Sequence, residues 1–148
     1  MNRQYASFFT RAVAYFIDLF ILSAIMTALT YLGVLSFFGI EYDLTQLGDA
    51  SYSLTNNRGY MLFSILIGIA YYASFHSSKW QATIGKKLLK IKVTTMDGRR
   101  ISFIRATVRY IVMFGLSNIF FIGYLLALFT KRKQALHDLI ARTEVRKD

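Results

Sequence analysis

The sequence predicts an all-α membrane protein, a small helical bundle with a short β-hairpin on its cytoplasmic side. Three observations predict this class: three long apolar segments, charges of which all but one lie outside these segments, and one stretch that alternates apolar and basic residues. Hydrophobic residues make up 55% of the 148 and charged residues 18%, yet the net charge is +10. The basic residues are therefore concentrated in a minority of the chain. Basic charge by itself would suit nucleic acid or an anionic membrane, and the long apolar segments favour the membrane as partner. We expect one domain over residues 1–148.

The apolar segments run from Ala12 to Phe38, from Tyr60 to Phe75 and from Tyr110 to Phe129. A helix that rises ~1.5 Å per residue crosses the hydrocarbon in about 20 residues, so the first two predict full spans. A polar, glycine-containing break at residues 114–118 interrupts the third. The third segment is therefore either one span or a re-entrant pair of short helices, which membranes tolerate where the break is enclosed in protein.

The charge of each loop predicts the orientation. The loop after the first span carries three acidic residues, whereas the stretch from Lys79 to Arg109 holds nine Lys or Arg and one Asp. The positive-inside rule puts the N-terminus and the second loop in the cytoplasm of a multi-pass cell-membrane protein. The basic run at residues 131–133 favours a cytoplasmic C-terminus as well, which requires the re-entrant reading of the third segment.

The predicted hairpin lies in the second loop. Leu89–Val93 alternates apolar and basic residues, Asp97-Gly98 is a turn signal, and the chain returns through Arg99 to Ser102. The tail at Thr143–Arg146 also alternates and could pair with this hairpin only from the same side of the membrane.

Asp18 is the only charged residue between Arg11 and Glu41, inside the first span. A carboxylate there costs at least ~2.5 kcal/mol on insertion scales, so an intramembrane acid is a functional-site hypothesis. Arg11 lies seven residues earlier, ~10 Å along the axis, and its side chain leans away from Asp18. We therefore expect each residue to find its partner on another segment.

Depth along the helices suggests neighbours for Asp18. Counting from the basic residue at the cytoplasmic edge of each segment puts Asp18 level with Tyr72 of the second segment and with Leu116, within the break of the third. The sequence therefore predicts an intramembrane polar cluster of Asp18, Tyr72, Ser117 and Asn118.

Three motifs resemble the RDD family of small integral membrane proteins. They are the Arg11…Asp18 pair at the first span, the Thr83-Ile-Gly85-Lys86 segment before a strand, and the stretch from Leu126 to Thr143 that contains Asp138. The resemblance covers nearly the whole chain and implies that Arg11, Asp18 and Asp138 are the three signature residues. One departure is Arg142, where the family usually has Gly. Asp138 lies just past the basic edge, level with Arg11, so we expect an ion pair between these two.

The basic residues Lys86, Lys87, Lys90 and Lys92 predict a surface that faces anionic lipid headgroups, each contributing ~1 kcal/mol near such lipid. The two histidines have no metal-motif spacing, and Gly85-Lys86 lacks the other residues of a phosphate loop. We expect no metal, no cofactor and no enzymatic activity.

Two functions remain open from the sequence. The RDD resemblance implies ion transport, including sodium/proton exchange, for which an intramembrane acid can bind a proton or a monovalent cation. Three or four segments hardly enclose a pathway, so transport requires a homo-oligomer, for which Gly68, Ala70 and Ala73 offer small contact residues. The alternative is an accessory module that anchors or modulates another membrane protein.

Overall fold

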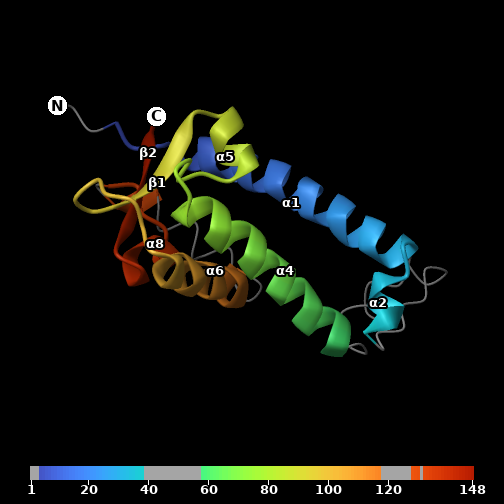
Figure 1. Ribbon diagram of the computed structural model, residues 1–148. Helices are drawn as coiled ribbons and strands as arrows, with labels where there is room; N and C mark the ends of the chain where they lie inside the picture. The colour runs from blue at the N-terminus through green and yellow to red at the C-terminus, as the bar shows by residue number, and fades with distance from the viewer. Residues whose placement is uncertain (1–3, 39–57, 118–127, 131) are drawn as a thin grey trace. The chain divides into compact units, whose positions relative to one another are not determined.

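The computed structural model describes residues 4–38, 58–117, 128–130 and 132–148, and within them the chain is mostly helical (Figure 1). Its elements are α1 (Phe8–Tyr31), α2 (Val34–Phe37), α4 (Arg58–Ser77), α5 (Ile84–Leu88), β1 (Ile91–Thr95), α6 (Phe103–Ser117), α8 (Leu136–Ile140) and β2 (Thr143–Lys147). The prediction of a mostly helical protein with a small antiparallel sheet is confirmed. The bundle arrangement and the single domain stay predictions.

The chain packs as two compact units, one of Met1–Asp18 with Ile69–Asp148 and one of Leu19–Gly68. In the second unit, Gly33 adopts a φ of +69° just after α1 and allows the chain to turn into α2. Leu35 is buried there, and the rings of Phe38 and Phe63 lie 5.9 Å apart. All the polar contacts described below lie in the first unit.

Two described helices, α1 and α4, are long and apolar enough to cross a membrane. Their most apolar windows are only 17% and 28% buried, whereas the core helix of a soluble protein is mostly buried. Large apolar side chains such as Phe9 and Phe16 point outward from α1. These two helices indicate a membrane protein.

The sheet pairs segments far apart in the sequence. Strands β1 and β2 are antiparallel, with Val93 opposite Val145 and Thr95 opposite Thr143. The N-terminal segment joins the other edge of β2, since the Ala6 N–H donates to the Val145 carbonyl at 3.0 Å. The stretch before α1, the loop after α4 and the tail therefore form one folded body.

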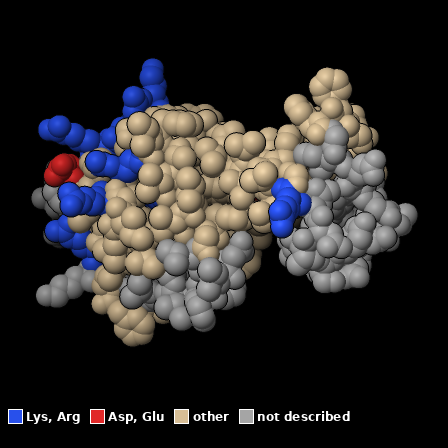
Figure 2. All heavy atoms as spheres, turned by 90° about the horizontal axis from the view of Figure 1, so that it is seen from below, with Lys and Arg blue, Asp and Glu red and all other residues tan. Residues whose placement is uncertain are grey.

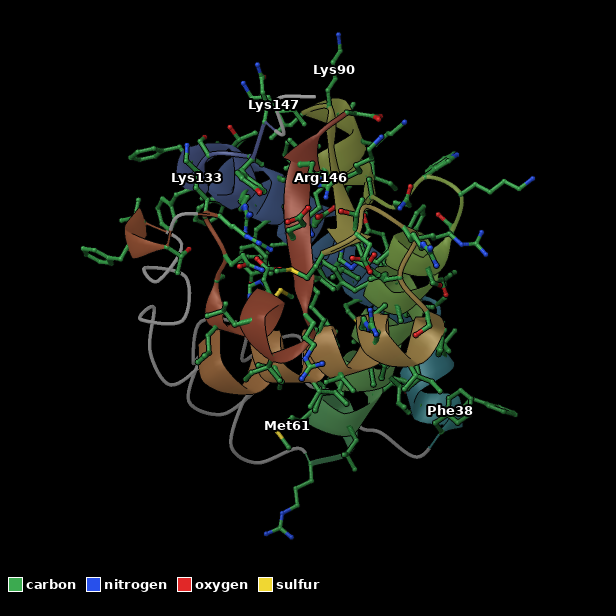
Figure 3. All side chains as sticks on the ribbon, turned by 90° about the vertical axis from the view of Figure 1, so that its left-hand side faces the viewer. Phe38, Met61, Lys90, Lys133, Arg146 and Lys147 are labelled. Atoms are coloured by element: carbon green, nitrogen blue, oxygen red, sulfur yellow. The ribbon has the colours of Figure 1, made fainter. Side chains whose placement is uncertain are left out.

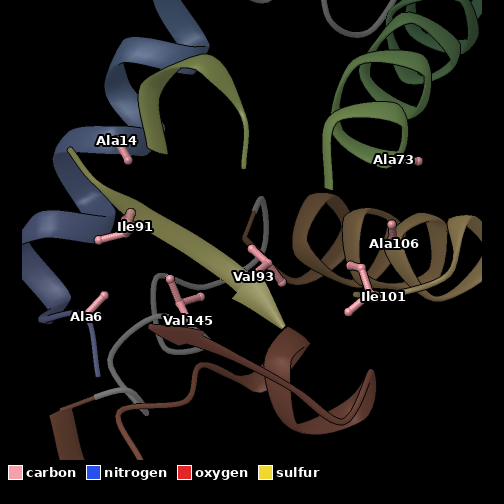
Figure 4. Close-up of a cluster of buried hydrophobic side chains, with 8 residues drawn as sticks. All are labelled: Ala6, Ala14, Ala73, Ile91, Val93, Ile101, Ala106 and Val145. Carbon is pink, nitrogen blue, oxygen red and sulfur yellow. The ribbon is translucent and has the colours of Figure 1, made fainter. Parts of the chain in front are cut away.

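A small apolar core lies beneath this sheet (Figure 4). Its buried side chains come from the N-terminal segment, α1, α4, the sheet, the loop after β1 and α6: Ala6, Ala14, Ala73, Ile91, Val93, Ile101, Ala106 and Val145. Ala73, proposed from the sequence for contact between copies, is fully buried within its own chain. This residue is therefore not available for an oligomer interface.

The predicted local hairpin is wrong in its second strand. The turn forms as expected, because Gly98 adopts a φ of +84° and its N–H donates to the Thr95 carbonyl at 2.9 Å. The return stretch makes only one further backbone bond to β1, and Ser102 instead accepts the Ala106 N–H at the start of α6. Strand β1 pairs instead with β2, which contains the alternating residues of the tail, Thr143–Arg146.

Helix α6 begins at Phe103, earlier than the third apolar segment predicted. Its buried residues, Ala106, Arg109, Tyr110 and Met113, recur every three to four positions and line one face. Arg109, expected at the end of a loop, is thus on the inward face of a helix. Residues 118–127 lie outside the described part of the chain, so the choice between a span and a re-entrant pair stays open.

The turn into β2 contains Arg142, at a position where the RDD family usually has glycine. Arg142 adopts a φ of +50°, a conformation that glycine reaches without strain. The turn nevertheless forms, since the Arg142 N–H donates to the Leu139 carbonyl at 3.2 Å.

Candidate functional site: a buried polar core

Asp138 is completely buried and forms ion pairs with two arginines. Nη1 of Arg11 donates to Oδ2 at 2.6 Å, while Nε and Nη2 of Arg109 donate to Oδ1 at 2.9 and 2.7 Å. Both guanidinium groups are themselves almost fully buried. This three-residue ion cluster, called the clasp below, joins α1, α6 and α8.

Local structure places the Asp138 carboxylate at the start of α8. The Ala135 N–H donates to Oδ2 at 3.2 Å, as an acid near a helix N-terminus allows, and the Thr143 hydroxyl donates to Oδ1 at 3.4 Å. Gln134 fixes the neighbouring strand by donating to the Thr143 carbonyl at 2.7 Å. The clasp is thereby connected to β2 as well.

Burial by itself would raise the pKa of Asp138, but the charges of Arg109 and Arg11 and the Ala135 N–H outweigh it and hold this pKa well below its usual value of 3.8. A carboxyl with a depressed folded pKa stabilises the fold above its unfolded pKa and loses that contribution as the pH falls. The clasp is therefore fully charged through the neutral range. It weakens only below about pH 4.

Asp18 is also completely buried, but its partners are neutral. The Tyr71 hydroxyl and the Gly85 N–H donate to Oδ1 at 2.9 and 2.8 Å, and the Thr83 hydroxyl donates to Oδ2 at 2.6 Å. Thr83 and Gly85 belong to the first turn of α5, so the carboxylate of α1 accepts the donors at that helix start. Tyr71 adds α4 to the same contact.

The close contact between α1 and α5 requires a glycine. A Cβ on Gly85 would lie 2.3 Å from the Ala14 carbonyl oxygen and 3.0 Å from Oδ1 of Asp18. Only a residue without a side chain allows the Gly85 N–H to reach the acid.

Lys86 follows directly and points inward, buried beside His76. Its Nζ lies 2.8 Å from Nε2 of His76. Burial, reinforced by the charge of Arg109, lowers the pKa of Lys86 well below its usual value, although Asp18 and Asp138 act in the opposite direction. Burial also lowers the pKa of His137 to about 3, so that ring is neutral at physiological pH.

A small internal cavity of about 20 Å³ lies among these groups. Its lining comes from α1, α4, α5, α6, α8 and β2: Arg11, Tyr15, Asp18, Tyr72, Lys86, Arg109, Met113, His137 and Val145. A volume of ~10–15 Å³ holds one water, so this cavity has room for a single water-sized particle.

The predicted pairing of Arg11 with Asp138 is confirmed. For Asp18, the tyrosine that donates is Tyr71, whereas the predicted Tyr72 borders the cavity beside the acid. The Ser117 side chain and Asn118 lie outside the described part, so their place in the cluster stays a prediction.

Lys86 does not belong to the predicted lipid-facing surface. It is 7% exposed, because α5 turns its side chain into the polar core. Lys87 and Lys92 are partly exposed and both pair with Asp148. Lys90 is exposed and extends from the end of the sheet near Lys147 (Figure 3).

Sequence reasoning did not identify Arg109, Tyr71, Thr83 or the inward direction of Lys86 as parts of the site. The signal for two of these was present, because the Thr83-Ile-Gly85-Lys86 motif supplies two donors to Asp18 and one group beside the cavity. Arg109 could have been found from the spacing of the inward face of α6.

We predict that Gly85→Ala destabilises the protein by about 1–3 kcal/mol, because the new methyl group overlaps the α1 backbone. Thermal unfolding in detergent measures this. The matched control is Gly115→Ala, since a Cβ on Gly115 meets nothing within 4 Å and alanine favours the helix. Equal stability of the two variants would contradict the close contact.

We predict that Asp138→Asn costs about 3–5 kcal/mol, because two buried arginines lose their counter-charge. Arg11→Met should cost less, since Arg109 still balances the acid. In a double-mutant cycle the two effects should fall short of adding, and additivity within ~0.5 kcal/mol would show that the pair is not coupled. Exchanging the charges of residues 11 and 138 should not restore stability, because an arginine at 138 would face Arg109.

Comparison with known proteins gives a family match over nearly the whole chain. Residues 5–142 match the RDD family. A relative, described as uncharacterized protein YxaI of Bacillus subtilis (strain 168), is 39% identical over 85 residues, which is 57% of this chain. The match spans 56% of that protein's length. No solved structure matches the chain. Because the family match extends from the N-terminal segment to the turn before β2 and includes Arg11, Asp18 and Asp138, the chain belongs to the RDD family.

Proposed function

We propose that this chain is an accessory membrane module, in which two spans carry a compact basic unit that anchors or modulates another membrane protein. The observation behind this proposal is that all four carboxylate oxygens of Asp18 and Asp138 accept hydrogen bonds from within the chain. Asp138 joins α1, α6, α8 and β2, and Asp18 joins α1, α4 and α5. Such contacts suit acids that hold a fold together.

We further propose that α1 and α4 cross the cell membrane and that the part of the first unit formed by α5, α8 and the sheet lies on the cytoplasmic side. Support comes from the concentration of Lys and Arg on this unit (Figure 2) and from the positive-inside rule. Pairing of β1 with β2 supports a C-terminus on the same side as the loop after α4.

Anionic lipid headgroups are the partner we propose for the exposed basic residues. Lys79 and Trp80 follow directly on the end of α4, and Trp80 is 53% exposed beside a shallow hollow that both residues line. Tryptophan and lysine at the end of a span commonly meet the headgroup layer. Lys87, Lys90 and Lys92 of the predicted surface remain exposed or partly so.

We predict that phosphatidylglycerol in nanodiscs raises the unfolding temperature more than phosphatidylcholine does. Changing Lys79 and Lys90 together to Gln should reduce that temperature difference, since each lysine contributes roughly 1 kcal/mol of attraction to anionic lipid. The matched control changes both to Arg, which keeps the charge and should keep the effect. A Gln variant with the full response would remove these lysines from the lipid contact.

A second candidate function is ion or proton-coupled transport, including cation/proton exchange, by a homo-oligomer. It is favoured by the position of Asp18, a fully buried acid on a helix long enough to cross a membrane, at the wall of an internal cavity. Against a cation in that cavity stand the three basic side chains that also line it, Arg11, Lys86 and Arg109.

Flux measurements on liposomes that contain only this protein separate the two functions. For an accessory module we predict sodium and proton flux no faster than in empty liposomes. Asp18→Asn should lower the stability by about 2–4 kcal/mol, because three hydrogen bonds to a charged group are weakened. The control is Asp97→Asn in the exposed turn after β1. Flux in the wild type that Asp18→Asn abolishes without unfolding would establish transport instead.

A further inference from the structure

The cavity in the polar core is surrounded by more positive than negative groups. Three buried cations, Arg11, Lys86 and Arg109, line it, and two buried acids, Asp18 and Asp138, balance them. With Lys86 protonated, one positive charge in this described cluster therefore has no counter-charge. A buried charge of that kind is unfavourable unless it is lost or paired.

Among the residues that the structure describes, no other buried ionisable group supplies the missing charge. Glu144 is buried but pairs with Arg146 and does not line the cavity. His76 accepts a hydrogen bond through Nε2 when Lys86 is charged, so its ring is then neutral. Two states remain: Lys86 neutral, or Lys86 charged with a bound anion.

The donors of an anion site are present on two elements. Arg109 uses Nε and Nη2 on Asp138, and its buried Nη1 has no hydrogen-bond partner among the described residues. Arg109 is 3% exposed. The charged Lys86 amine donates one hydrogen bond to His76 and has two further N–H donors. An anion in the cavity would accept from both side chains.

The size of the cavity selects the ligand. About 20 Å³ accepts one particle near the size of water, so a monatomic anion fits while sulfate and phosphate do not. The Asp18 carboxylate also borders the cavity, but its oxygens are occupied by Tyr71, Thr83 and Gly85. We propose that the cavity between Arg109 and Lys86 binds one halide ion, taken up together with a proton on Lys86.

The groups that face Lys86 decide its proton affinity. They come from α1, α4, α6 and α8: Arg11, Tyr15, Asp18, Tyr72, His76, Arg109, His137 and Asp138. Burial and the two arginines favour the neutral amine, and the two acids oppose them with less effect. A halide adds a negative charge next to Nζ and restores the charged form. Halide binding therefore carries one proton with it.

The test uses the full chain in detergent at constant ionic strength, with chloride or bromide replacing gluconate. We expect halide to raise the unfolding temperature at pH 6 and to have little effect at high pH. Above the pKa of Lys86 the apparent halide affinity should fall roughly tenfold per pH unit, as uptake of one proton with the ion requires. Broadening of the chloride NMR line by the wild-type protein reports binding directly, and bromide should reverse this broadening by displacing the bound chloride.

Lys86→Met removes the uncompensated charge and should abolish the halide response, whereas Lys92→Met at the surface should keep it. Anomalous scattering from bromide should place one ion between Arg109 and Lys86. An identical unfolding temperature in halide and gluconate at pH 6, a pH-independent affinity, or a response that survives Lys86→Met would each overturn the proposal. Should Lys86→Met not fold, the wild-type pH dependence and the bromide position still decide. None of these measurements depends on whether the protein transports ions.

Discussion

The double contact of Asp138 with Arg11 and Arg109 is the interaction on which the rest of the first unit depends. The acid lies at the start of α8, one arginine comes from the first turn of α1, and the other comes from the inward face of α6. Each charge is buried, so removal of the acid leaves two arginines without a counter-charge in a low-dielectric interior, whereas removal of one arginine leaves the other paired with Asp138. The clasp therefore specifies how the tail, the first helix and α6 meet.

Asp18 performs a related task with different partners. Its donors are two hydroxyls and one backbone N–H, and the approach of α5 depends on the missing side chain of Gly85. The two acids thus have different roles, since Asp138 neutralises two arginines and Asp18 orients the short helix α5. That short helix is what turns Lys86 toward the cavity.

The same polar core explains why a cation pathway and a halide site are different proposals. Asp18 by itself attracts cations, which is the basis of the transport candidate. The cavity as a whole, however, borders three basic side chains, and its charge is balanced by an anion or by loss of the Lys86 proton. The sum of the buried charges around the cavity, and not Asp18 by itself, therefore decides between these two proposals.

The sequence by itself determined the two long apolar helices and the Arg11–Asp138 pair, because apolar length, charge and family spacing are one-dimensional signals. Counting along the helices gave the depth of Asp18 but not its direction, and neighbouring helical residues point about 100° apart. Tyr71, not Tyr72, therefore supplies the hydroxyl. Only the tertiary structure decided that Lys86 turns inward, that Arg109 shares the clasp and that β1 pairs with the distant β2, since these contacts join segments whose approach no local pattern encodes.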